Sequence, residues 1–205
     1  MDNKDVFDET DKLEQITVQS IITDSIRVKQ AILENENFTS AIEAVSRLVT
    51  KAFSNGNKVL FCGNGGSAAD AQHLAAELSG RFYKNRPALY AEALHVNSSY
   101  ITAVANDFGY DEIYARLIQA MGTPGDILFA ISTSGNSPNI IKAIDEAHNR
   151  GMRVIGMTGE SGGKMSMMCD YMFRVPSDDT PRIQESHIMI GHIICYFVEQ
   201  QLYHV

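Results

Sequence analysis

Several features that would place this sequence in a special class are scarce or missing. The 205 residues contain only three cysteines, Cys62, Cys169 and Cys195, and no CxxC pair, so neither a disulfide framework nor a cysteine zinc cluster is indicated. Fifteen glycines and five prolines are too few for a disordered or fibrous chain. No apolar run reaches the length of a membrane span, and the acidic N-terminus is not a signal peptide. These absences favour a soluble, cytoplasmic protein without a membrane partner.

Positive charge is also in short supply. Lys and Arg number 17 against 25 Asp and Glu, which gives a net charge of -8. Such a surface repels phosphate backbones, so general nucleic-acid binding is not expected. A local anion site built from backbone N–H groups remains compatible with this charge. The hydrophobic share of 44% allows a sizeable core.

Short apolar runs alternate with helical segments through most of the chain. The runs, which predict strands, lie at residues 58–62, 91–96, 126–131, 152–157 and 171–175. Helical patterns lie at residues 16–35, 37–53, 68–79, 101–105, 112–119, 138–150 and 182–202. Continuous apolar strands between helices indicate a parallel sheet covered on both faces. The predicted fold class is therefore α/β, a doubly wound five-stranded parallel sheet with extra N-terminal and C-terminal helices.

The length predicts a single domain over residues 1–205, with a flexible tail at 1–14. The helices at 15–56 and the terminal helix exceed what five strands need as cover. Surplus amphipathic helices are typical of oligomer interfaces, so we expect these helices to be used in oligomerisation.

The segment from Ser132 to Pro138 follows a predicted strand and precedes a helix. It carries four hydroxyls in six residues, those of Ser132, Thr133, Ser134 and Ser137. Ser137 occupies the N-cap position before Pro138, and Gly135 lets the backbone approach an anion. The segment thus suits a sugar phosphate, bound at the free N–H groups of a helix N-terminus. An ordinary capped loop is the alternative, because serine, threonine and asparagine are common in turns.

A second strand-to-helix loop is rich in glycine. Gly63-Asn64-Gly65-Gly66-Ser67 resembles part of the dinucleotide fingerprint, but Ala68 stands at its third glycine position. No acidic residue ends the second strand, which disfavours NAD. No nucleoside triphosphate loop is present.

Ionisable side chains occur on two predicted helices. His73 and Glu77 are four residues apart and share one helix face, either as a functional pair or as an ordinary solvated pair. The terminal helix carries Gln184 and His192, eight residues and about 12 Å apart. His192, among isoleucines, is compatible with a core position. Whether Gln184 and His192 reach one site, or sites on different subunits, is left open by this spacing.

Taken together, several segments resemble the phosphoheptose isomerases (sedoheptulose-7-phosphate isomerases) of the SIS-domain family. The resemblance covers residue 30 to the C-terminus and rests on Cys62–Ser67, His73-x-x-x-Glu77-Leu78-x-Gly80-Arg81, Asn85-Arg86-Pro87, Asn106-Asp107-Phe108-Gly109, Ile131–Ser137, Thr158-Gly159, Arg182-Ile183-Gln184-Glu185-x-His187 and His192. It implies conversion of sedoheptulose 7-phosphate to D-glycero-D-manno-heptose 7-phosphate, a step towards bacterial surface glycans such as lipopolysaccharide. It also implies a homotetramer with active sites between subunits.

The resemblance also implies roles for single residues. Glu77 and His192 would be the proton-transfer pair. The phosphate would be held by the four hydroxyl residues Ser132, Thr133, Ser134 and Ser137. Glu77 and further residues would contact the sugar, namely Asn64, Gly65, Gly66, Asn106, Asp107 and Gln184. In members with zinc, one Zn²⁺ per subunit would be bound by His73, Glu77, Gln184 and His192.

One position departs from the family, and two other functions compete. Pro181 stands where some members have Asp before the Arg-Ile-Gln-Glu run, so the resemblance assigns no sugar contact to this position. A related SIS group, which is not enzymatic, binds the bacterial replication initiator protein and shares the stretch around His73. Those adaptors lack the glutamate and histidine that match Glu77 and His192. A sugar-phosphate sensor would keep the serine loop without needing Glu77. We therefore favour the enzyme.

Overall fold

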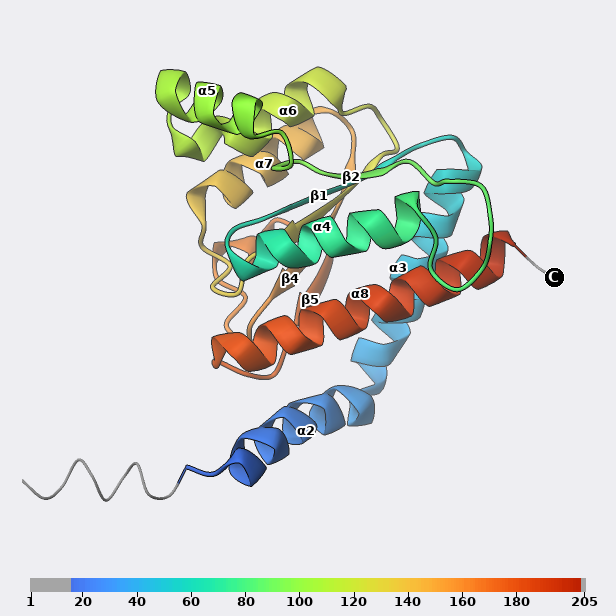
Figure 1. The fold of residues 1–205 in the computed structure, drawn as a ribbon, viewed down its shortest axis with the longest axis vertical. Coiled ribbons are helices and arrows are strands. Elements are labelled where there is room, and N and C mark those ends of the chain that lie inside the picture. The colour runs from blue at the N-terminus through green and yellow to red at the C-terminus, as the bar shows by residue number, and fades with distance from the viewer. Residues whose placement is uncertain (1–15, 204–205) are drawn as a thin grey trace, which may run out of the picture.

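The computed structural model describes residues 16–203, and the flexible tail expected at residues 1–14 lies outside them. In this part of the chain five parallel strands form one sheet in the order β2-β1-β3-β4-β5 (Figure 1). The strands are β1 Val59–Gly63, β2 Ala91–Ala93, β3 Ile127–Ile131, β4 Arg153–Thr158 and β5 Tyr171–Arg174. This order is that of a flavodoxin-like doubly wound sheet, so the predicted fold class is confirmed.

Helices cover both faces of the sheet (Figure 1). The covering helices are α3 Glu36–Ser54, α4 Gly66–Ser79, α5 Ser98–Phe108, α6 Ile113–Met121, α7 Pro138–Asn149 and α8 Thr180–Leu202, and α2 Val18–Glu34 precedes them. Two short 3₁₀ helices, η1 Tyr110–Glu112 and η2 Lys164–Met167, were not predicted from the sequence.

The strands are buried on both faces because neighbouring residues supply different cores. Val59 and Phe61 of β1 join a cluster with α3, α4 and α8. Leu60 and Cys62, which alternate with these two residues along β1, belong to the other cluster, which includes residues of α5, α6 and α7. Alternate side chains of a strand point to opposite faces, so a strand with a helix layer on each side must be apolar throughout.

Most element ends differ by a few residues from the sequence prediction, and three of these differences concern segments near the ligand edge of the sheet. The strand expected at 91–96 ends at Ala93, because the Val96 N–H donates to the Ala93 carbonyl and closes a turn. Helix α4 begins at Gly66, two residues earlier than expected. Helix α8 begins at Thr180, with Pro181 in its first turn, where a missing N–H costs little.

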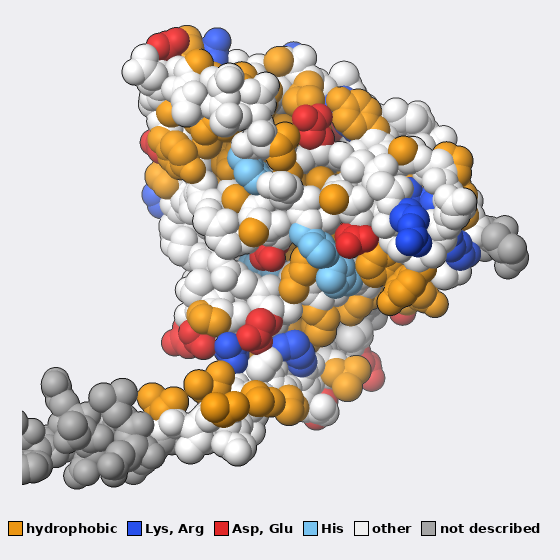
Figure 2. Space-filling model, in the orientation of Figure 1, with side chains coloured by type: hydrophobic (Ala, Val, Ile, Leu, Met, Phe, Trp, Pro, Cys, Tyr) orange, Lys and Arg blue, Asp and Glu red, His pale blue; other side chains and the backbone are white. Residues whose placement is uncertain are grey.

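Helix α2 lies outside the sheet layers and contacts α8 (Figure 1). Ile32 of α2 is buried in the core that α8 shares, and further contacts between the two helices are polar. Lys29 and Ser25 bind the Glu185 carboxylate at 3.3 and 2.6 Å, and Arg182 donates to the Ile21 carbonyl at 2.9 Å. Helix α2 has exposed large apolar side chains, Val18, Ile21, Ile22, Ile26 and Leu33, and hydrophobic side chains lie along it in the view of Figure 2. None of the helices in residues 16–203 is long and apolar enough to cross a bilayer.

Candidate active site

The hydroxyl-rich loop connects β3 to α7 at the carboxyl edge of the sheet. Ser132 Oγ lies 3.0 Å from Ser137 Oγ and 3.5 Å from Ser134 Oγ, so three hydroxyls converge. Ser137 is the N-cap residue by position, but its side chain makes no cap hydrogen bond. The predicted N-cap position is therefore confirmed, and because the Ser137 hydroxyl turns towards Ser132 it does not cap the first N–H groups of α7.

Packing against another segment of the chain requires glycine at position 135 of this loop. The φ of Gly135, +65°, is one that glycine adopts freely, and a Cβ there would collide with the Gly162 carbonyl oxygen. The sequence predicts that Gly135 lets the backbone approach an anion, and in the structure its nearest neighbour is the segment after β4. This packing closes one side of the loop and leaves the hydroxyl side open.

A cleft of about 210 Å³ opens beside the loop. It lies between the loop, the segment after β4 and the start of α8, and its lining includes Thr133, Ser134, Gly159, Ser177 and Thr180. The hydroxyls of Thr133 and Ser134 make its loop side suited to a phosphate group, whereas Glu160 and Asp178 make another part of its lining acidic.

The glycine-rich loop between β1 and α4 is tied to the hydroxyl-rich loop. The side-chain amides of Asn64 and Asn139 donate to each other, at 2.9 and 2.8 Å, and the Tyr110 hydroxyl also donates to Asn64, at 3.2 Å. These bonds occupy the Asn64 oxygen and one of its N–H groups, so the side chain predicted to contact the sugar also braces the two loops. Sequence reasoning missed Asn139 and Tyr110, because only the folded chain brings them to Asn64.

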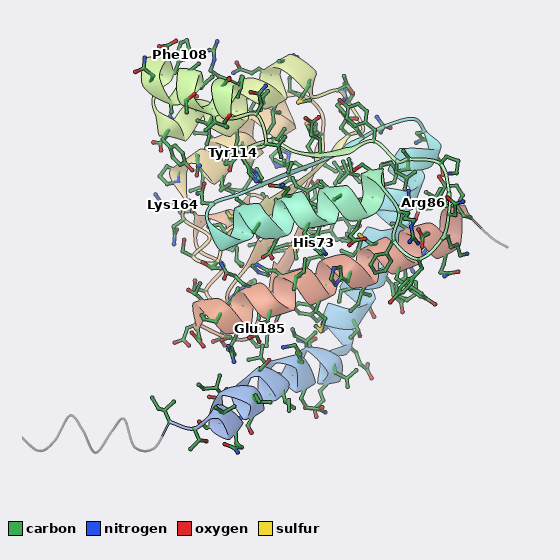
Figure 3. The ribbon with its side chains drawn as sticks, in the orientation of Figure 1. His73, Arg86, Phe108, Tyr114, Lys164 and Glu185 are labelled. Carbon is green, nitrogen blue, oxygen red and sulfur yellow. The ribbon has the colours of Figure 1, made fainter. Side chains whose placement is uncertain are left out.

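Helices α4 and α8 run side by side in the same direction and bring two sets of predicted residues together (Figures 1 and 3). At the start of α4, a Cβ on Gly66 would collide with the Gln184 amide. Two turns further on, His73 Nε2 lies 2.9 Å from His192 Nε2 and 3.2 Å from a Glu77 oxygen. His192 is therefore not a core residue, and His73 and Glu77 are more than a solvated pair. Gln184 and His192 remain apart along α8, as their spacing predicted.

His73, Glu77 and His192 each offer one ligand atom, and these atoms lie within 4.8 Å of one another. Two imidazoles and a carboxylate are a common donor set for zinc sites that keep an open position. Burial lowers the pKa of His192, the neighbouring His73 lowers it further, and Glu77 opposes both. A neutral imidazole is the form that binds a metal or accepts a proton. Histidine side chains are exposed at the surface over α4 and α8, so the cluster is accessible (Figure 2).

The remaining predicted residues lie elsewhere in this chain. Asn106 and Asp107 end α5, exposed, and hydrogen bond to each other at 2.8 Å. Figure 3 places Phe108, the next residue, at the edge of the molecule and well away from His73. Lys164, which sequence reasoning missed, donates its backbone N–H to Asn136 at 3.0 Å and so puts a cation next to the hydroxyl-rich loop.

A doubly wound domain with a hydroxyl-rich loop suited to phosphate and a cluster of acid–base side chains is typical of proteins that act on small phosphorylated substrates.

Comparison with known proteins identifies the family. The model of the SIS domain family matches residues 22–159. The phosphoheptose isomerase of Aneurinibacillus thermoaerophilus is 51% identical over 91% of this chain and 94% of its own length. Phosphoheptose isomerase 2 of Campylobacter jejuni is 50% identical over 91% of this chain and 92% of its own length.

Solved structures agree with these relatives. A phosphoheptose isomerase from Neisseria gonorrhoeae superposes with a TM-score of 0.84 at 41% identity, covering 89% of this chain and 97% of that one. A phosphoheptose isomerase from Francisella tularensis superposes with a TM-score of 0.86 at 40% identity, covering 89% of this chain and 96% of that one. The chain belongs to the phosphoheptose isomerases of the SIS-domain family, and it is an isomerase. The resemblance noted from the sequence is thereby confirmed.

Proposed function

We propose that this chain interconverts sedoheptulose 7-phosphate and D-glycero-D-manno-heptose 7-phosphate in the cytoplasm, as a step towards a bacterial surface glycan. The observation that carries the proposal is the contact between His73, Glu77 and His192 across α4 and α8, in a domain whose sheet carries a hydroxyl-rich loop at its ligand edge. The relatives named above support this substrate through their names. An adaptor or sensor would have no need for the acid–base cluster.

The proposed reaction moves a proton between two adjacent carbons of the open-chain sugar. In our mechanism the Glu77 carboxylate removes the proton from one carbon and returns it to the other through an enediol, as a general base. His192 exchanges protons with the oxygens, and its lowered pKa suits a neutral imidazole that can donate an N–H to the carbonyl. Ser132, Thr133, Ser134 and Ser137 hold the phosphate, so that binding energy distant from the reacting carbons orients them.

Zinc fits the cluster, and we propose that His73, Glu77 and His192 hold one ion per chain, with Gln184 as the fourth ligand. The donor set and the closeness of the three ligand atoms support this. The position of Gln184 against Gly66 means that its side chain must reach along α8 to join them. A bound zinc ion would polarise the substrate carbonyl. A carboxylate that binds the metal is a weaker base, so we expect exchangeable binding.

We further propose one SIS domain over residues 1–205 and a homotetramer that uses the helices at 15–56. The exposed apolar side chains of α2, which include Ile22, Ile26 and Leu33, support burial against another copy. Asn106 and Asp107 belong to the end of α5, next to Phe108, which lies well away from His73 in Figure 3, and this separation within one chain supports sites shared between subunits.

The deciding experiment is a turnover assay with the purified protein and sedoheptulose 7-phosphate, with the aldose product followed by NMR. We expect heptose 7-phosphate to form, and its absence would contradict the proposed reaction. Metal analysis of the same preparation, purified without chelator, tests the zinc proposal, with His73→Ala as the variant expected to lose the ion. Light scattering of the same sample gives the number of subunits.

A further inference from the structure

Arg86 lies in the loop that follows α4, and its guanidinium is buried against the end of that helix (Figure 3). Its Nη2 donates to the Glu77 carbonyl oxygen at 2.9 Å and its Nη1 to the Leu78 carbonyl at 2.8 Å. The last carbonyls of a helix have no partner within it, so a cation there satisfies them and interacts favourably with the helix dipole. Arg86 therefore fixes the turn of α4 from which the Glu77 side chain projects.

Glu199, near the end of α8, is the counter-ion of Arg86. Arg86 Nε donates to it at 2.9 Å, and only 2% and 1% of the two side chains are exposed. The Glu199 carboxylate also accepts the backbone N–H groups of Phe82, Tyr83 and Lys84, at 3.3, 2.8 and 2.9 Å. Burial acts to raise the pKa of Glu199, but these backbone bonds and Arg86 outweigh it and lower the pKa. The carboxylate is thus ionised and holds the loop to α8.

The loop that Glu199 holds contacts the second member of the proton-transfer pair. The Phe82 ring lies against the His192 ring, with centroids 5.7 Å apart and an interplanar angle of 30°. This one buried ion pair therefore helps to position both Glu77 and His192. Arg86 binds the backbone of Glu77 directly, and Glu199 holds the loop whose Phe82 ring packs on His192. Neither member of the ion pair needs to touch a substrate for this effect.

We propose that Arg86 and Glu199 are positioning residues for the isomerisation, which hold the Glu77 carboxylate and the His192 imidazole in register across α4 and α8. This inference rests on the proposed function, because it takes Glu77 and His192 as the reacting pair. Their mutual distance is set by helix packing, and displacement of about 1 Å can cost about 10²-fold in rate.

A purely structural role is the alternative, and the chain offers a matched control for it. Lys58 and Asp126 form a second buried ion pair, at 2.5 Å, with 12% and 1% of the side chains exposed. Asp126, like Glu199, also accepts backbone N–H groups, those of Lys58 and Thr123. This pair precedes β1 and β3, at the edge of the sheet opposite the ligand edge. Asp126→Asn thus removes an equivalent charge without touching the site.

The experiment compares Glu199→Gln with Asp126→Asn in the full-length protein, with kcat and KM for sedoheptulose 7-phosphate expressed per folded molecule. Both substitutions are expected to lower Tm. Only Glu199→Gln should lower kcat, by about 10²-fold, while KM stays within about threefold, because the phosphate loop is untouched. Equal kcat values for the two variants would overturn the proposal.

Two further variants keep the test decisive if Glu199→Gln does not fold. Arg86→Lys keeps the charge but cannot bind Glu199 and two carbonyls at once, so kcat should fall with little change in KM. Phe82→Leu leaves the ion pair and its backbone bonds intact, and should lower kcat about tenfold through the loss of the contact with His192. Wild-type kcat in both variants would overturn the proposal.

The outcomes also separate this inference from the proposed function. A wild-type protein without isomerase activity would remove the proposed function. Suppose instead that the wild type is active, that Glu77→Gln inactivates it, and that Glu199→Gln and Phe82→Leu are both fully active. This result would contradict only the positioning role.

Discussion

His73 and His192 are 119 positions apart in the sequence, yet their Nε2 atoms lie 2.9 Å apart. The contact exists because α4 and α8 pack side by side in the same direction (Figure 3). Glu77, one turn beyond His73, completes the cluster at 3.2 Å. Substitutions in this cluster should therefore change chemistry before they change folding, since its side chains lie at the helix surfaces and outside both apolar cores.

Replacement of Glu77 by glutamine tests the base. The amide has nearly the same shape but cannot accept the proton, so kcat should fall by about 10²–10⁴-fold. Folding and subunit number should not change, because Arg86 binds the backbone of Glu77 and not its carboxylate. Kinetics, thermal melts and light scattering check these expectations, with Asp145→Asn at an exposed position of α7 as the control. Unchanged turnover in Glu77→Gln would exclude this residue as the base.

Ser134→Ala tests the hydroxyl-rich loop. The Ser134 hydroxyl faces Ser132 and accepts a hydrogen bond from the Asn136 N–H, so it is held in place before any ligand arrives. Loss of one hydrogen bond to a charged phosphate should raise KM by about 10- to 100-fold and affect kcat less. Steady-state kinetics measure both constants, and Ser54→Ala at the exposed end of α3 is the matched control. A KM equal to that of the wild type would argue against phosphate binding at this loop.

The fold was predictable because strands of a sheet that is covered on both faces must be apolar at every position, and this pattern can be recognised in the sequence. Runs such as Val59–Cys62 and Ile127–Ile131 are apolar throughout, which only a covered parallel strand requires. The hydroxyl-rich loop was predictable because all its residues are adjacent. The contact of His73 with His192 was not, because it depends on the direction in which α8 returns past α4. The side-chain direction of Ser137 and the pairing of Asn64 with Asn139 depend in the same way on neighbours distant in the sequence.

His187 should make stability depend on pH. It is fully buried, its Nε2 lies 3.2 Å from the Thr158 carbonyl oxygen, and its Nδ1 has no partner among the described residues. Burial lowers its pKa to about 4, although the bond to Thr158 opposes the shift. Below the ordinary pKa of about 6.5 the unfolded chain binds a proton that the folded chain does not, so stability falls as the pH falls towards 4.

The expected size of this effect is about 2 kcal/mol of unfolding free energy lost between pH 7 and pH 5. Urea unfolding at the two pH values measures it. His187→Gln, which does not titrate, should be less stable at pH 7 but should lose less on acidification, whereas His148→Gln, at an exposed histidine, should behave like the wild type. An equal loss in His187→Gln and wild type would assign the acid sensitivity to other groups.

Gly66→Ala separates the role of Gln184 from stability. A Cβ at Gly66 would collide with the end of the Gln184 side chain, which is flexible and can move away, and alanine is a better helix former than glycine. We therefore expect an unchanged or higher Tm together with a lower kcat/KM, since Gln184 is pushed out of its place between α4 and α8. In a Gln184→Ala background the same substitution should have no further effect on activity, because the residue it displaces is absent. If Gly66→Ala lowered kcat/KM equally in both backgrounds, the loss would come from the glycine-rich loop itself and Gln184 would have no part in it.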